Sequence, residues 1–125
     1  MDNAVKKILP VAGRGMIAVM AVFFGLGHFM STGEMVGAVP VPGGAFWVYF
    51  TGVCLIAGGV GLFVPKVAKL AGVLLGLLIL IFALGVHLRF FIATGEQSHL
   101  MPLFKDLAIA GGAWLAAVVS DLKCQ

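Results

Sequence analysis

The chain has 125 residues, of which 62% are hydrophobic and only 10% are charged, and its mean hydropathy is +1.15. A soluble domain of this size cannot keep so many apolar side chains from water, so the composition predicts an integral membrane protein. The net charge of +3 does not indicate a nucleic-acid partner, because the basic residues flank apolar runs and form no patch of their own.

Four strongly apolar spans with few charges follow one another along the chain. They cover residues 15–30, 46–64, 67–93 and 103–122. The clearest part is Leu70–Leu88, which as a helix is about as long as a bilayer core is thick, roughly 30 Å. The alternating pattern of a membrane β-barrel is absent, and helices satisfy their own backbone hydrogen bonds in lipid. The sequence therefore predicts an all-α protein, a four-helix transmembrane bundle that forms a single domain over residues 1–125.

The basic residues predict the orientation of the bundle. Four crossings place most of them on one side of the membrane, namely Lys6, Lys7, Arg14, Lys66, Lys69 and Lys123. Only Arg89 and Lys105 lie on the opposite side. Because basic connections are retained in the cytoplasm, we expect both termini to be cytoplasmic.

The same topology gathers ionisable residues near the outer face. His28 lies near the outer end of the first span, and His87 near the outer end of the third. A single histidine at this depth is explained by hydration, but two on different helices predict a functional site, since ionisable groups in a membrane are costly. The other candidates on this side are Arg89, Lys105 and Asp106, followed by Glu34, Glu96 and His99.

Lys105 and Asp106 are neighbours in the predicted first turn of the fourth span. Adjacent helical residues point in different directions, so they are a poor mutual pair. We expect the helix dipole to stabilise Asp106, which leaves Lys105 to pair with a residue on another helix.

Three chemistries are open to this cluster. A quinone headgroup needs hydrogen-bond donors and a proton source, and histidine supplies both near neutral pH. A b-type haem needs axial histidines, which His28 and His87 would provide from two helices. Zinc or copper could use His28, His87, His99 and a carboxylate, but no tight ligand spacing supports it and no metal ligand is assigned.

Aromatic and small residues have two interpretations each. Phe46, Trp47, Tyr49 and Phe50 begin the second span, where they form an interfacial belt or wall a flat ring that enters between the helices; Phe90 and Phe91 carry the same ambiguity. Small residues at four-residue spacing indicate close helix packing and leave dimerisation open. They are Ala57 and Gly61; Ala68, Gly72 and Gly76; and Ala108, Gly112 and Ala116.

Several stretches, taken in order, resemble a known family. They are Gly27-His28-Phe29, then TGVCLIAGGVGLFVPKVAKLAGVLLGLL, Val86-His87 and FKDLAIAGGAWLAA. From about residue 15 to residue 117 the chain resembles the DoxX family of small bacterial four-helix membrane proteins. The resemblance implies the bacterial cytoplasmic (inner) membrane and a redox context, such as electron transfer to quinone or oxidative stress.

The matching positions are His28, His87, Lys105 and Asp106. Many relatives carry an acidic residue before the diglycine of the second span, where this chain has only Cys54 and apolar residues. If relatives use that carboxylate as a proton relay, this protein either lacks the step or supplies it from Glu34 or Glu96.

We therefore expect a redox-linked inner-membrane protein that holds a quinone near its outer face. His28 and His87 would contact the headgroup, while Arg89, Lys105 and Asp106 tune charge and proton supply. One alternative is a non-catalytic membrane subunit or assembly factor, which docks a soluble or membrane oxidoreductase or a second copy of itself. Another is a b-type haem protein with His28 and His87 as ligands, and a proton-coupled carrier ranks last.

Overall fold

The computed structural model describes residues 2–30, 33 and 44–123, with side chains placed as far as Ser120. Its long helices are α1 (Asn3–Met30), α3 (Gly44–Gly61), α4 (Ala68–Phe82) and α6 (Leu100–Lys123). A π-helical segment (Ala83–Leu88) and α5 (Arg89–Thr94) continue α4, and a short 3-10 turn (Gln97–His99) leads into α6. Four helical segments are long and apolar enough to cross a membrane, and the described residues contain no strand. The predicted four-helix transmembrane bundle is confirmed, so the chain is a multi-pass membrane protein whose apolar helices contact lipid.

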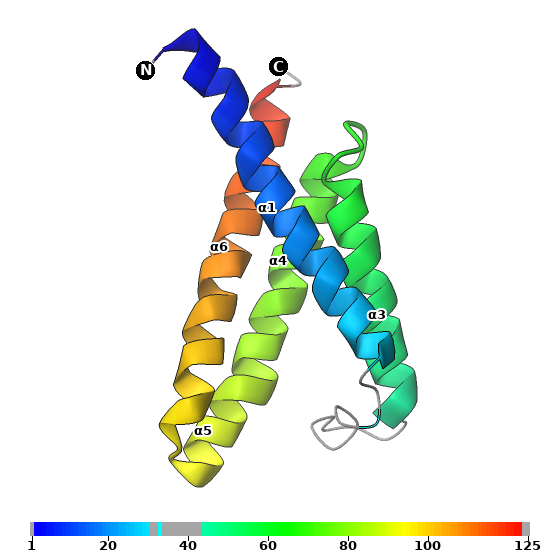
Figure 1. The fold of residues 1–125 in the computed structure, drawn as a ribbon, viewed down its shortest axis with the longest axis vertical. Coiled ribbons are helices and arrows are strands. Elements are labelled where there is room, and N and C mark those ends of the chain that lie inside the picture. Colours follow the sequence, from blue (N-terminus) through cyan, green and yellow to red (C-terminus); the bar gives the residue numbers. More distant parts are fainter. Residues whose placement is uncertain (1, 31–32, 34–43, 124–125) are drawn as a thin grey trace.

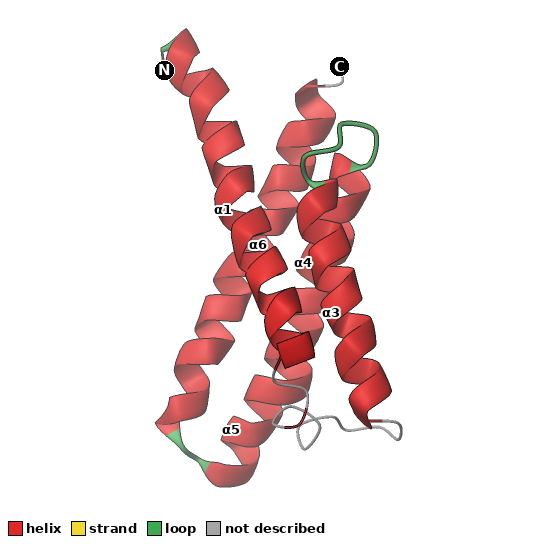
Figure 2. Cartoon of the chain, turned by 45° about the vertical axis from the view of Figure 1, so that its right-hand side comes forward, coloured by secondary structure: helices red, strands yellow, loops and turns green. Residues whose placement is uncertain are grey.

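The helices form two antiparallel pairs. Helix α1 packs along α3, and α4 packs along α6 (Figure 1). Both termini lie at one end of the bundle, which we call the terminal end, and the two pairs diverge toward the opposite end, which we call the cavity end (Figures 1 and 2). This divergence makes room for side chains between the pairs at the cavity end.

Glycine brings the backbones together within each pair. A Cβ added at any of five glycines would lie 3.0 Å or less from a backbone oxygen of the partner helix: Gly25 and Gly52 against each other, Gly59 against Ala18, Gly72 against Ala113, and Gly76 against Ala110. Lipid offers helices no hydrophobic gain on association, so such close van der Waals contact is what holds them. The packing role predicted for Gly72 and Gly76 is confirmed. On α6 the opposing residues are Ala110 and Ala113, whereas the predicted Ala108 is exposed.

The first helix is longer than the span predicted from the absence of charge. It begins at Asn3 instead of residue 15 and passes through Pro10, which removes one backbone donor without ending the helix. Residues 2–9 are all exposed, so the helix projects beyond the rest of the bundle at the terminal end (Figure 1). The charges that delimit the apolar span therefore do not delimit the helix.

Two further boundaries also differ from the predicted spans. Helix α3 ends at Gly61, three residues before the predicted end, because tight turns at Phe63 and Val64 precede Pro65. Helix α6 begins at Leu100 instead of residue 103, with Pro102 in its first turn, where its missing N–H has no helical partner to lose. Asp106 consequently lies in the second turn, so the expected stabilisation by the helix N-terminus is wrong.

A candidate functional site between the helix pairs

A cavity of about 540 Å³ lies between the two pairs toward the cavity end. All four long helices contribute to its wall, which is mostly aliphatic and aromatic. The polar residues of the wall are His28, Thr51, His87, Lys105 and Asp106. An apolar cavity of this size with a few convergent polar groups is typical of a small-molecule site. Four of the five residues predicted for the site are therefore brought together.

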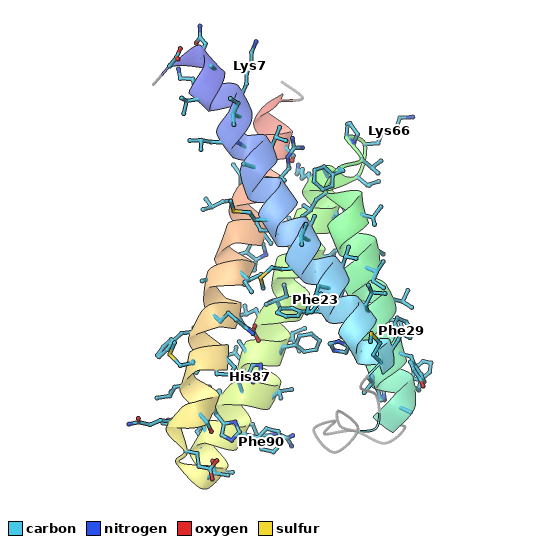
Figure 3. The ribbon with its side chains drawn as sticks, in the orientation of Figure 1. Lys7, Phe23, Phe29, Lys66, His87 and Phe90 are labelled. Carbon is cyan, nitrogen blue, oxygen red and sulfur yellow. The ribbon has the colours of Figure 1, made fainter. Side chains whose placement is uncertain are left out.

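The centre of the polar group is an interhelical pair. Nε2 of His87 lies 3.0 Å from Oδ2 of Asp106, and Asp106 is only 5% exposed. A buried carboxylate requires a hydrogen-bond partner, and His87 supplies it from the helix alongside α6 (Figure 3). Interaction with His87 thus replaces the helix dipole as the stabilising contact for Asp106.

The π-helical segment determines which residue of α4 completes this pair. In an α-helix, the residue seven positions after Phe82 returns to the same face, and that residue is Arg89. The wider π-helical turn, with hydrogen bonds between residues five apart, instead brings His87 onto the face of Phe82. Phe82 and His87 both line the cavity. Arg89 is turned away, and its guanidinium carbon lies 4.9 Å from the centre of the Phe90 ring.

His28 enters the cavity from α1 and is held by two contacts. Its Nδ1 donates a hydrogen bond to the carbonyl oxygen of Phe24 at 2.7 Å. Its ring stacks on Phe82 of α4, with centroids 5.9 Å apart. Because a carbonyl oxygen only accepts, Nδ1 carries the proton in this arrangement, and Nε2 is the accepting nitrogen of the ring.

Lys105 crosses from α6 to α1. Its Nζ lies 4.8 Å from the centre of the Phe24 ring, within the range of a cation–π interaction. The expectation that Lys105 turns away from Asp106 and reaches another helix is confirmed, although its partner there is an aromatic ring.

The remaining ionisable candidates lie elsewhere. Glu96 and His99 lie beyond the helix end, with 3.8 Å between Oε2 and Nε2, and neither belongs to the cavity wall. Glu34 lies outside the described residues. Within the part of the chain that the structure describes, no three His, Cys, Asp or Glu side chains lie close enough together to hold a metal ion.

The aromatic residues at the start of α3 divide between the two interpretations. Trp47 and Phe50 line the cavity, and Phe46 packs against both of their rings. Tyr49 instead stacks on Phe29 of α1, with 5.5 Å between centroids. Phe90 stacks on His99, away from the cavity wall.

The sequence did not single out several wall residues, among them Phe24, Thr51, Leu55 and Phe82. These helices are apolar on all sides, so hydropathy does not distinguish lipid-facing from cavity-facing positions. For Phe24 a signal existed, because it lies one helical turn before His28. Phe82 had no such signal, since its spacing to His87 depends on the π-helical turn.

Comparison of the chain with protein-family models, with curated proteins and with solved structures gives no match.

Proposed function

We propose that this chain is a redox-linked, DoxX-like protein of the bacterial inner membrane that binds a quinone headgroup in the cavity between its helix pairs. The observation that carries the proposal is the buried Asp106–His87 pair in an otherwise apolar, aromatic-walled cavity. A quinone is a flat apolar ring with two carbonyl oxygens, which such a cavity matches in shape and polarity.

The polar residues have complementary roles in this proposal. Asp106 accepts from Nε2–H of His87 and orients the ring, so Nδ1 is the nitrogen of His87 that exchanges a proton with the quinone oxygen. Nε2 of His28, the accepting nitrogen, takes a hydrogen bond from a hydroxyl of the reduced ring, and the ammonium of Lys105 stabilises negative charge that develops there during reduction. The electrons come from a partner oxidoreductase.

The haem alternative uses the same two histidines. Nε2 of His87 already lies at Asp106, so iron ligation would use Nδ1, the nitrogen nearer the main chain. A quinone needs only hydrogen bonds, which favours it over haem. A reduced-minus-oxidised spectrum separates the two, because haem gives sharp visible bands and quinone changes only the ultraviolet region.

The proposed orientation places the terminal end in the cytoplasm. Lys7 and Lys66 both lie at that end (Figure 3), as the retention of basic residues in the cytoplasm requires. The cavity then opens in the outer half of the bilayer.

A second function, that of an accessory subunit for a partner oxidoreductase, is supported by the projecting start of α1. Residues 2–9 are exposed along the whole of this segment, which offers a docking site at the terminal end. Stable co-purification of a partner that is lost when residues 2–9 are deleted, with no quinone bound to the wild type, would favour this function.

The quinone proposal is tested with His28→Ala and His87→Ala, with His99→Ala as the matched control outside the cavity. Bound quinone is extracted from purified protein, and decylubiquinone affinity is measured by titration. His87→Ala should weaken binding of decylubiquinone, and His28→Ala binding of its reduced form decylubiquinol, each by about tenfold, as expected for the loss of one hydrogen bond to a charged or polarised group. Unchanged binding in both cavity variants would overturn the proposal.

A further inference from the structure

We infer that the ligand enters sideways from the lipid through a window between α3 and α4, and that its hydrophobic tail remains there. The window is defined by Trp47 and Phe50 of α3 and Ile81 of α4. This inference rests on the proposed quinone site and specifies its ligand as a long-tailed, membrane-dissolved amphiphile.

The window residues belong both to the cavity wall and to the outer surface of the bundle. All three line the cavity, yet Trp47 is 40%, Phe50 50% and Ile81 55% exposed. Lys105 is the other exposed residue of the wall, but it reaches across to the Phe24 ring, so the three apolar side chains mark the mouth of the cavity. In a membrane-spanning segment that surface faces lipid, so the mouth opens to the bilayer.

The other sides of the cavity are spanned by contacts. Gly25 of α1 lies against the backbone of Gly52 on α3, and Gly76 of α4 lies against α6. Lys105 crosses the side between α1 and α6 to reach the Phe24 ring. Toward the terminal end, α3 and α4 converge at Gly58, where an added Cβ would lie 3.2 Å from Leu75. These contacts leave the α3–α4 side as the lateral opening.

The polarity of the wall matches an amphiphile that enters ring first. Four of the five polar wall residues, His28, His87, Lys105 and Asp106, lie on α1, on α6 or beyond the end of α4, whereas the three side chains of the mouth are aromatic and aliphatic. A ring that reaches the polar residues therefore leaves its attached chain between Phe50 and Ile81. Each buried methylene of that chain adds to binding, so the site selects quinones with a tail over soluble quinones of the same ring.

The test is photolabelling of the full-length protein in lipid nanodiscs. The probe is a decylubiquinone analogue that carries a diazirine on its alkyl tail, and the labelled residues are identified by mass spectrometry. Adducts should map to the window residues, and excess unlabelled decylubiquinone should reduce their yield by at least about tenfold. Gly85→Leu should remove the same adducts, because Gly85 lines the cavity and an added Cβ there meets open space.

The control is Gly111→Leu, an exposed position where an added Cβ also meets no neighbour, and it should keep the adducts. Adducts on α1, on α6 or on Arg89–Thr94 that unlabelled decylubiquinone reduces and that Gly85→Leu removes would overturn lateral access between α3 and α4. They would leave the proposed quinone site intact. Adducts that unlabelled quinone does not reduce at any position would overturn both the window and the proposed function.

Discussion

The two halves of the bundle differ in how closely the helix pairs approach each other and in where polar side chains meet. In the terminal half the pairs are in contact, because an added Cβ at Gly58 or Gly61 of α3 would meet Leu75 or Ala71 of α4, and Leu62 is fully buried. In the cavity half the helix pairs diverge, and Gly85 faces open space. His87 and Asp106 meet in this more open half, where the bundle has room for polar side chains. Tight packing at one end thus supports an opening at the other.

The largest expected effect comes from breaking the packed half with Gly72→Leu. The new Cβ would lie 2.8 Å from the carbonyl oxygen of Ala113, which is backbone and cannot move without separating α4 from α6. We expect a loss of about 1–3 kcal/mol in the free energy of unfolding, the usual range for overpacking, measured by thermal unfolding in detergent. Gly111→Leu is the control and should unfold at the wild-type temperature. Equal stability of the two variants would contradict the close packing.

The fold could be predicted from the sequence, because the length of an apolar span and the spacing of its small residues can both be read within a single helix. His28, His87, Lys105 and Asp106 were also predicted, because the topology alone places them at one end of the bundle. Their pairing was not predictable, since the contact between His87 and Asp106 depends on the π-helical segment. Arg89 was assigned to the site because the topology places it on the same side of the membrane as these residues, whereas the direction in which its side chain points depends on the π-helical segment.

In the open half, Asp106→Ala should have the next largest effect. It leaves His87 without the carboxylate that holds its ring, so we expect decylubiquinone affinity to fall by about tenfold. Asp106→Asn keeps an acceptor for Nε2–H and should retain more affinity than Asp106→Ala. Titration of the three proteins checks this order, and equal affinity of all three would exclude a role for the pair in binding.

Deletion of Leu84 tests whether quinone binding requires the π-helical geometry itself or only the helix face on which His87 lies. Leu84 is exposed to lipid, and its removal converts the segment to a regular α-helix in which His87 follows Phe82 by four residues and keeps the same face. We expect quinone affinity within about threefold of the wild type. The wider π-helical turn and a regular α-helix with one residue fewer both place His87 on the same helix face as Phe82. A complete loss of binding would show that the π-helical geometry itself is required.

The smallest effect is expected for Arg89→Ala. The guanidinium lies over Phe90 and does not belong to the cavity wall among the described residues. We expect quinone affinity within about twofold of wild type, since loss of an exposed cation–π contact has little effect on binding elsewhere. A tenfold loss in the same titration would place Arg89 at the ligand and contradict the helix phase that the π-helical turn sets.

The most direct measurement of the central claim, a quinone site in the open half, is decylubiquinone titration of the wild type, Gly85→Leu and Gly111→Leu. Leucine at position 85 occupies the cavity, whereas leucine at position 111 faces away from the other helices. The wild type and Gly111→Leu should bind saturably with equal affinity, and Gly85→Leu should bind at least about tenfold more weakly. Equal affinity in all three proteins, or no saturable binding to the wild type, would contradict a quinone site in this cavity.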